Sequence, residues 1–220
     1  KADAASVFRA GYPQGAAAVL LVELDGLEAG MDEEETRIRR IAEENRAIEF
    51  KTARDEAERQ QLWKGRKGAF GAMGRINTDL YVLDGVVPRT RLEEVLNVVY
   101  AIAKKHRVTL SNVFHAGDGN LHPNISYDGR DPEERARVLA AGREILEACV
   151  RAGGSISGEH GIGLEKMEFM PLCFSPEDLQ LQKDIRHSVD PLELSNPGKI
   201  FPDSRSCVEV GKRKAGQVPL

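Results

Sequence analysis

Apolar and polar residues recur along the chain with two periods, and each period predicts a different kind of element. Residues 89–106 place Leu92, Val95, Val99 and Ala103 on one face of a helix. Further helices are predicted at 31–50, 55–67, 131–152, 164–170 and 175–191. Short apolar runs predict strands at 16–26, 48–53, 79–88, 108–117 and 121–127.

This order of elements predicts an α+β fold, with an antiparallel sheet that carries helices on one face. A duplicated ferredoxin-like layout suits the alternation of strands and helices. The turn Gly-Asp-Gly-Asn at 117–120 lies between two predicted strands and indicates a hairpin. We expect residues 1–200 to form one domain and residues 201–220 to be a tail. No glycines fall in a GxGxxG pattern, so the sequence indicates no Rossmann site.

Composition narrows the classes of partner. The net charge of −4 comes from interleaved acidic and basic residues, which argues against nucleic acid or an anionic membrane as the main partner. The longest apolar run, AAAVLLV at 16–22, is too short to span a bilayer. Cys149, Cys173 and Cys207 have no zinc-binding spacing and suggest a reducing compartment, so we expect a cytoplasmic protein.

Two histidines flank the predicted hairpin turn in the stretch NVFHAGDGNLHPN. Side chains at paired positions on one sheet face lie about 5 Å apart, so His115 and His122 are candidates to bind one metal ion. The alternative is a pair of half-buried histidines bonded to the backbone, because a metal site usually needs three protein ligands. The loop SGEHGIG offers a third ligand in Glu159, with His160 beside it. A helix cap formed by Ser157 and Glu159 is the structural alternative there.

A second group of candidates lies in the glycine-rich segment WKGRKGAFGAMGR, which carries Arg66, Lys67 and Arg75. A guanidinium group binds a carboxylate through two parallel hydrogen bonds, which would suit an acidic substrate. Charges of a solvated helix explain the same residues equally well. Tyr81 and Asp84 on the next predicted strand are open to the same two interpretations.

Three motifs, HAGDGNLHPN, GGSISGEHGIGLEK and DPLELSNPGKIFP, resemble the C-terminal domain of FAD-linked oxidases of the vanillyl-alcohol-oxidase type. The stretch WKGRKGAFGAMGRINTDLYVLDGVVPR is most similar to a branch that includes glycolate oxidases and the D-lactate and D-2-hydroxyglutarate dehydrogenases. The resemblance implies oxidation of a small 2-hydroxy acid, glycolate or D-lactate, to the 2-oxo acid, with hydride transfer to FAD. It also implies that an N-terminal FAD-binding domain, not part of these residues, holds most of the flavin.

The resemblance assigns roles residue by residue. It implies that His115, His122 and Glu159 bind a divalent metal, which would be zinc, iron or manganese. It implies that His160 is the general base. Arg66, Asn124 and Tyr81 become candidates for binding the substrate, and Glu159, His160, Gly161 and Asn196 become candidates for contact with the cofactor. Some family members carry a lysine where this chain has Val82, which argues for a small substrate rather than a bulky diacid.

Two alternatives stay open at this point. One is a free-standing metal-dependent enzyme that uses the two histidines and the glutamate without flavin, and the other is a non-catalytic docking module of an oxidase complex. The resemblance also leaves open other oxidase subunits, a homo-oligomer, and peripheral contact with the inner membrane through the complex. We expect these residues alone to be catalytically silent without the FAD-binding domain.

Overall fold

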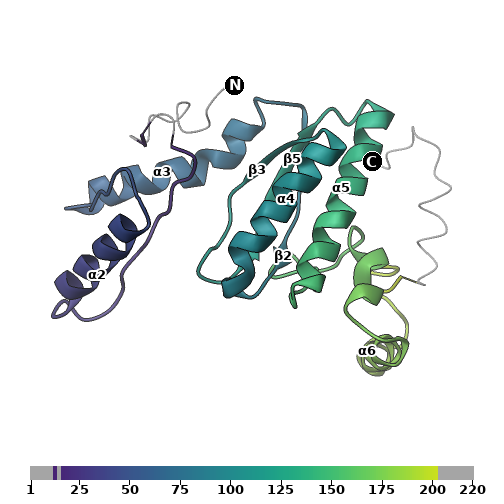
Figure 1. The fold of residues 1–220 in the computed structure, drawn as a ribbon. Coiled ribbons are helices and arrows are strands. Elements are labelled where there is room, and N and C mark those ends of the chain that lie inside the picture. Colours follow the sequence, from purple (N-terminus) through teal and green to yellow (C-terminus); the bar gives the residue numbers. More distant parts are fainter. Residues whose placement is uncertain (1–11, 14–15, 203–220) are drawn as a thin grey trace. The chain divides into compact units, whose positions relative to one another are not determined.

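A computed structural model describes residues 12–13 and 16–202, apart from the side chain of Phe70 (Figure 1). The predicted tail beyond residue 202 lies outside these residues. The chain divides into two compact units, one up to Asn77 and one from Thr78, and each is described by itself. No helix in the described part of the chain is long and apolar enough to cross a membrane.

The first unit contains two helices, α2 at Met31–Glu44 and α3 at Glu56–Met73. The strands predicted at 16–26 and 48–53 are wrong, because both segments are irregular in the structure. Leu20 is 72% exposed and Val22 is 54% exposed, so the apolar run has no buried face in this unit. A strand needs a hydrogen-bonded neighbour, and an apolar pattern alone does not supply one.

Helix α3 continues six residues beyond the predicted end at Lys67, through a segment rich in glycine. Glycine costs about 1 kcal/mol relative to alanine inside a helix, which is why the prediction stopped early. At Gly65 the lack of a side chain allows Tyr12 to pack against the helix, because an added Cβ would lie 2.4 Å from the Tyr12 ring. The Tyr12 hydroxyl also donates a hydrogen bond to the Leu62 carbonyl. This close packing explains why glycine is tolerated at Gly65.

The second unit is built on a three-stranded antiparallel sheet of order β1-β5-β3. The strands are β1 at Asp79–Val82, β3 at Thr109–Asn112 and β5 at Pro123–Tyr127. Two short strands, β2 at Gly85–Val86 and β4 at Asn120–Leu121, pair with each other beside this sheet. Because β1 and β3 both run antiparallel to the strand between them, the chain forms a split β-α-β unit.

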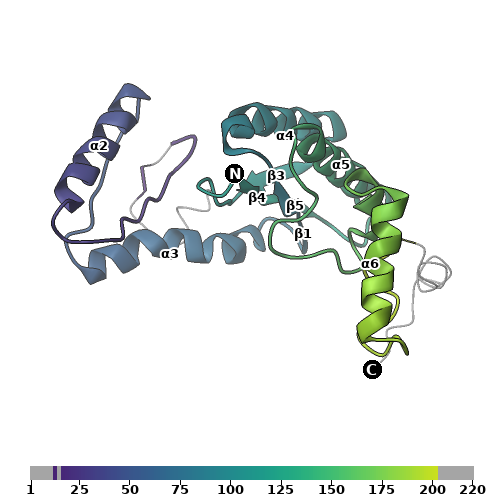
Figure 2. The ribbon, with the colours of Figure 1, turned by 90° about the horizontal axis from the view of Figure 1, so that it is seen from below.

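Two long helices cover one face of this sheet, as Figures 1 and 2 show. They are α4 at Leu92–His106, after the 3₁₀ turn η1 at Arg89–Arg91, and α5 at Pro132–Arg151. Asp131 caps α5 by accepting hydrogen bonds from the amides of Glu133 and Glu134. The core between helices and sheet is contiguous; its fully buried members include Leu83, Val99, Leu121, Ile125, Ile145 and Leu146.

The remaining elements follow α5. The helix predicted at 164–170 is a 3₁₀ turn, η2 at Met167–Leu172, with Pro171 inside it. Helix α6 at Pro176–Val189 begins with a capping box, in which Ser175 and Asp178 each bond the other's backbone amide. Residues 190–202 are irregular, as predicted for the segment LSNPGKIFP.

The predicted α+β class, the antiparallel sheet and the helices on one face are confirmed. The predicted duplication is not confirmed, because the described residues contain one split β-α-β unit. A second split β-α-β motif is not found in the described residues, because the strands expected at 16–26 and 48–53 do not form.

We predict that Gly85→Ala destabilises the protein by about 1–3 kcal/mol, the range expected for overpacking. A Cβ at this position would lie 2.7 Å from the Cys149 sulfur but 3.4 Å from the Cys149 Cβ. Adding Cys149→Ala should therefore remove most of the penalty, with a coupling energy of about 1 kcal/mol or more in urea unfolding. Gly117→Ala is the matched control, because its added Cβ would meet nothing within 4 Å. Strictly additive effects of Gly85→Ala and Cys149→Ala would contradict the contact.

Candidate metal and substrate site

His122 lies between β4 and β5 and is only 4% exposed. Its Nδ1 lies 3.2 Å from the carbonyl oxygen of Leu83. A carbonyl oxygen only accepts hydrogen bonds, so Nδ1 carries the proton and Nε2 presents a lone pair. This contact fixes both the tautomer and the orientation of the ring, as a backbone carbonyl does for many metal-binding histidines.

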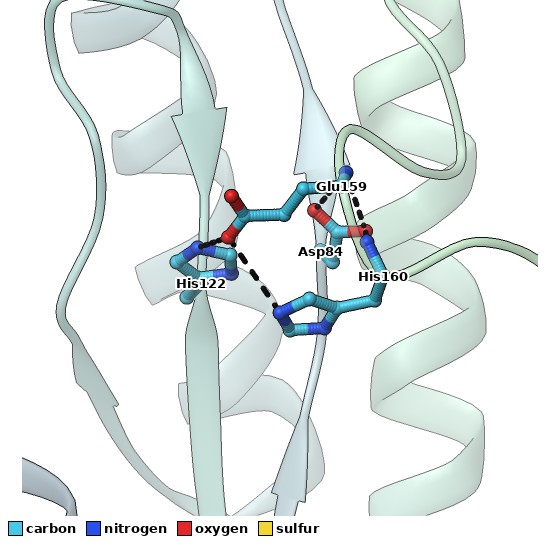
Figure 3. Close-up of side chains that lie close together, drawn as sticks. All are labelled: Asp84, His122, Glu159 and His160. Atoms are coloured by element: carbon cyan, nitrogen blue, oxygen red, sulfur yellow. Dashed lines mark hydrogen bonds and ion pairs between the residues drawn. The ribbon is translucent and has the colours of Figure 1, made fainter.

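The Glu159 carboxylate lies beside the rings of His122 and His160 (Figure 3), and it also faces the ring of His115. One of its oxygens, Oε1, lies 2.8 Å from Nε2 of His122, 3.6 Å from Nε2 of His160 and 3.8 Å from Nε2 of His115. The rings of His122 and His160 stack with their centroids 5.0 Å apart. The structure therefore brings together the four residues that sequence analysis proposed for metal binding and proton transfer.

His115 reaches this group from the other stem of the predicted hairpin, which the structure confirms. His115 and Asn120 exchange backbone hydrogen bonds of 3.0 and 3.3 Å across the turn. His122 is therefore a diagonal neighbour of His115 rather than its direct partner, and the ring centroids lie 5.5 Å apart. Gly119 makes the turn possible, because its φ is +71° and a Cβ there would lie 2.1 Å from the Val87 carbonyl oxygen.

The loop that carries Glu159 and His160 is held against the ends of β1 and β2. Ser155 and Val86 exchange backbone hydrogen bonds of 3.0 Å, which starts the loop beside β2. The Asp84 carboxylate then accepts hydrogen bonds from the amides of Glu159 and His160, at 3.2 and 2.8 Å. The loop is therefore positioned by backbone contacts, and its acidic and imidazole side chains are left to face the site.

Asp84 is fully buried, and several protein groups donate hydrogen bonds to its carboxylate, mostly to Oδ2. Besides the loop amides, Ser157 Oγ donates at 2.7 Å and Lys166 Nζ donates at 3.1 Å. Burial alone would raise the pKa of Asp84, but these hydrogen bonds and the positive charge of Lys166 outweigh it and hold the pKa below its ordinary value. An oxygen of Asp84 lies within 4.8 Å of a possible ligand atom on each of His122, Glu159 and His160. Because its oxygens are occupied by protein donors, we assign Asp84 to support of the site rather than to metal binding.

The proposed ligand atoms of His122 and Glu159 suit a cation. Nε2 of His122 and Oε1 of Glu159 are both acceptors, and two acceptors 2.8 Å apart repel each other unless a proton or a cation lies between them. Ligand atoms about 2.1 Å from a tetrahedral zinc ion lie about 3.4 Å apart. The separations of Glu159 Oε1 from the imidazole nitrogens of the other two proposed ligands, His122 and His115, are 2.8 and 3.8 Å and bracket that value. The residues present therefore fit a divalent ion.

Asn124 and Tyr81, two predicted substrate-binding residues, lie on opposite faces of the sheet. Asn124 is fully buried, and its side-chain oxygen has no hydrogen-bond partner among the described residues. Tyr81 pairs with Ile125 in the sheet register and packs against α5, where a Cβ on Gly142 would lie 2.6 Å from its ring. Burial raises the pKa of Tyr81 to about 12. The structure thus packs Tyr81 on the helix-covered face, away from Asn124, and its substrate role stays a prediction.

The other predicted residues lie outside the cluster of histidines. Arg66 lies on α3 in the first unit, so the structure does not test its role at the site. Gly161 has a φ of +78° and donates its amide to Ser157 Oγ at 2.9 Å, next to the site loop. Asn196 is exposed after α6, with a φ of +48° and its side-chain oxygen 2.9 Å from Lys199 Nζ.

Sequence reasoning left Asp84 ambiguous and did not single out Lys166. The only signal for Asp84 is an acidic residue inside the apolar run LYVLDGVV, where a charge needs a buried partner. Lys166 gives no comparable signal, because LEKMEF reads as the start of an ordinary amphipathic segment. The contact between them joins residues 82 positions apart and depends on the folded sheet.

Comparison with known proteins points to one family. Residues 2–200 match the family described as FAD linked oxidases, C-terminal domain. The chain is 45% identical over 202 residues to glycolate oxidase subunit GlcD of Escherichia coli K12, which covers 92% of this chain and 40% of that protein. It is 34% identical over 191 residues to GlcD of Bacillus subtilis, which covers 87% and 41% of the two chains. It is 32% identical over 184 residues to a probable mitochondrial D-lactate dehydrogenase of Danio rerio, which covers 83% and 37%. The chain therefore spans about two fifths of the length of these relatives.

We predict that Asp84→Asn destabilises the fold by about 3 kcal/mol or more at pH 7, because Lys166 becomes a buried charge without a partner. The pKa of Asp84 is lowered by folding, so its ionisation stabilises the protein above its ordinary pKa of about 4 and loses this effect as the pH falls toward the folded-state value. Denaturant unfolding at pH 7 and pH 3 should show a smaller penalty at pH 3. Asp118→Asn, at an exposed turn residue, is the control. An equal penalty at both pH values would contradict the lowered pKa.

Proposed function

The chain belongs to the family of C-terminal domains of FAD-linked oxidases, and we propose that it is the substrate- and metal-binding domain of an FAD-dependent 2-hydroxy-acid oxidoreductase. The observation that carries this proposal is the Glu159 carboxylate oxygen, which lies within 2.8–3.8 Å of three imidazole nitrogens. Such a cluster suits metal-assisted deprotonation of an alcohol. The family match favours this function over a flavin-free metal enzyme or a docking module.

The names of the relatives support the substrate class. Two are glycolate oxidase subunits and one is a probable D-lactate dehydrogenase. Glycolate and D-lactate are both small 2-hydroxy acids with one carboxylate. In the sheet register Val82 pairs with Asn124, so an apolar side chain neighbours the proposed substrate residue. A second substrate carboxylate would find no charged partner in Val82, which supports a monocarboxylic acid.

The residues of the site have different proposed roles in the reaction. His115, His122 and Glu159 would hold the divalent ion, and zinc, iron and manganese all suit these ligands. A bound divalent ion lowers the pKa of a neighbouring hydroxyl group. His160 would take the hydroxyl proton as the general base. Its closeness to the proposed metal ligands supports this role, since its ring stacks on His122 and its Nε2 lies 3.6 Å from Glu159 Oε1. Asn124 and Arg66 would orient the substrate, with the guanidinium binding the carboxylate group.

FAD, when bound, supplies the acceptor for the hydride of the substrate carbon. The half-exposed side chains of Glu159 and His160, together with Gly161 and Asn196, are the proposed contacts of this chain with the cofactor. We propose residues 1–200 as the domain that performs this role beside an FAD-binding domain. We also propose a cytoplasmic enzyme that works with other oxidase subunits and reaches the inner membrane only through them, since two relatives are named as subunits.

We predict that the protein, purified without chelator or nickel resin, contains about one equivalent of zinc, iron or manganese by elemental analysis. His122→Ala should lower the affinity for the ion by about 100-fold or more, because it removes a buried ligand whose orientation is fixed. His187→Ala is the matched control, because His187 is exposed on α6. A wild-type protein without metal, or a His122→Ala variant that keeps it, would refute the metal site.

We predict that Arg66→Lys in the full-length enzyme raises the KM for glycolate or D-lactate by about 10- to 100-fold, because lysine cannot make two parallel hydrogen bonds to a carboxylate. Arg59→Lys is the control on the same helix, since Arg59 pairs with Glu56 and Glu23 on the surface. Steady-state kinetics for both acids would test this. Equal KM values for the Arg66→Lys enzyme and the wild type would remove Arg66 from the substrate site.

A further inference from the structure

Lys166 is the one buried lysine among the described residues, and only 4% of its surface is exposed. It lies at the far end of the loop that carries Glu159 and His160, just before η2. Its Nζ donates to Asp84 Oδ2 at 3.1 Å and to Ser157 Oγ at 3.1 Å. A buried ammonium group is costly unless paired, so this position is strongly constrained.

These contacts join the two ends of the loop. Ser157 opens the segment and Lys166 ends it, and both bind the same oxygen of Asp84. Between them, the amides of Glu159 and His160 donate to that same oxygen at 3.2 and 2.8 Å. The Gly158 amide donates to it as well, at 3.2 Å, so the loop has one anchor at each end and three between them, and all five converge on one carboxylate.

Side-chain contacts restrain Glu159 and His160 mainly through the ring of His122. Their side chains are 49% and 46% exposed, so little apolar contact restrains them. Their position opposite His122 depends on where the loop backbone lies, and the backbone is held by Asp84. Without Lys166, the Asp84 carboxylate would keep a buried negative charge with no positive partner, and water or the loop itself would have to compensate it.

We infer that Lys166 is a positioning residue, which acts through Asp84 and Ser157 to hold Glu159 and His160 against His122. This inference rests on the proposed function, because the arrangement that it maintains is the proposed metal and proton-transfer site. Lys166 contacts neither the candidate metal ligands nor the general base through its side chain. Its effect is on the geometry of the loop.

The test combines two measurements on the full chain. The first is hydrogen exchange of the peptide containing residues 157–165, measured by mass spectrometry without metal. The second is titration with Co²⁺ alone, followed by its visible absorption. The variants are Lys166→Met, which removes the charge, and Lys166→Arg, which keeps it. Lys104→Met is the control, at an exposed lysine on α4.

Lys166→Met should exchange the loop amides faster than the wild type and bind Co²⁺ about 10- to 100-fold more weakly, as for loss of other groups that support metal ligands. The absorption bands should shift, and Lys166→Arg should recover most of both effects. Lys104→Met should match the wild type. If Lys166→Met does not fold, Ser157→Ala decides by the same two measurements, because it removes one anchor without leaving a buried charge.

The outcomes separate the two proposals. A folded Lys166→Met protein with wild-type exchange, affinity and spectrum overturns the positioning role, while the proposed metal site stands. A wild-type protein that binds no Co²⁺ overturns the proposed metal site. Faster loop exchange in Lys166→Met would in that case still support the positioning of the loop by Lys166.

Discussion

The buried carboxylate of Asp84 is the constraint on which the site depends. A charge that is fully removed from water must be surrounded by donors, and five donors from residues 157–166 supply that need. The loop therefore has little freedom in where it lies, although the sequence between Gly153 and Gly163 is rich in glycine. A flexible segment becomes an ordered one because it satisfies a charge at the end of a strand.

The same strand end also orients the other half of the site. Leu83 bonds His122 through its carbonyl group, and Asp84, the next residue, bonds the loop of Glu159 and His160. Both contacts depend on the register in which β1 pairs with β5, with Val82 opposite Asn124. A slip of one residue would turn each of these side chains to the other face of the sheet. The site is therefore as rigid as the pairing of β1 with the central strand β5.

Local signals explain which parts of this arrangement the sequence predicts. The hairpin around Gly119 and the helices α4 and α5 depend on residues a few positions apart, so the sequence predicts them. The partnership of Asp84 with Lys166 and the failure of residues 16–26 to form a strand depend on distant pairing. The face of the sheet on which Tyr81 lies also depends on distant pairing, because only the register of β1 with β5 fixes it.

The two faces of the central strand β5 and of the residues just before it carry different kinds of side chain, and burying the polar ones costs free energy. Ile125 and Leu121 lie in the core, whereas His122, Asn124 and Ser126 are buried polar residues at every second position. The unpaired oxygen of Asn124 loses hydration without gaining a protein partner, which costs about 1–3 kcal/mol. A sheet selected only for stability would place an apolar residue there. If Asn124 has the proposed substrate role, we expect a polar group of the ligand to bond this oxygen and offset the cost.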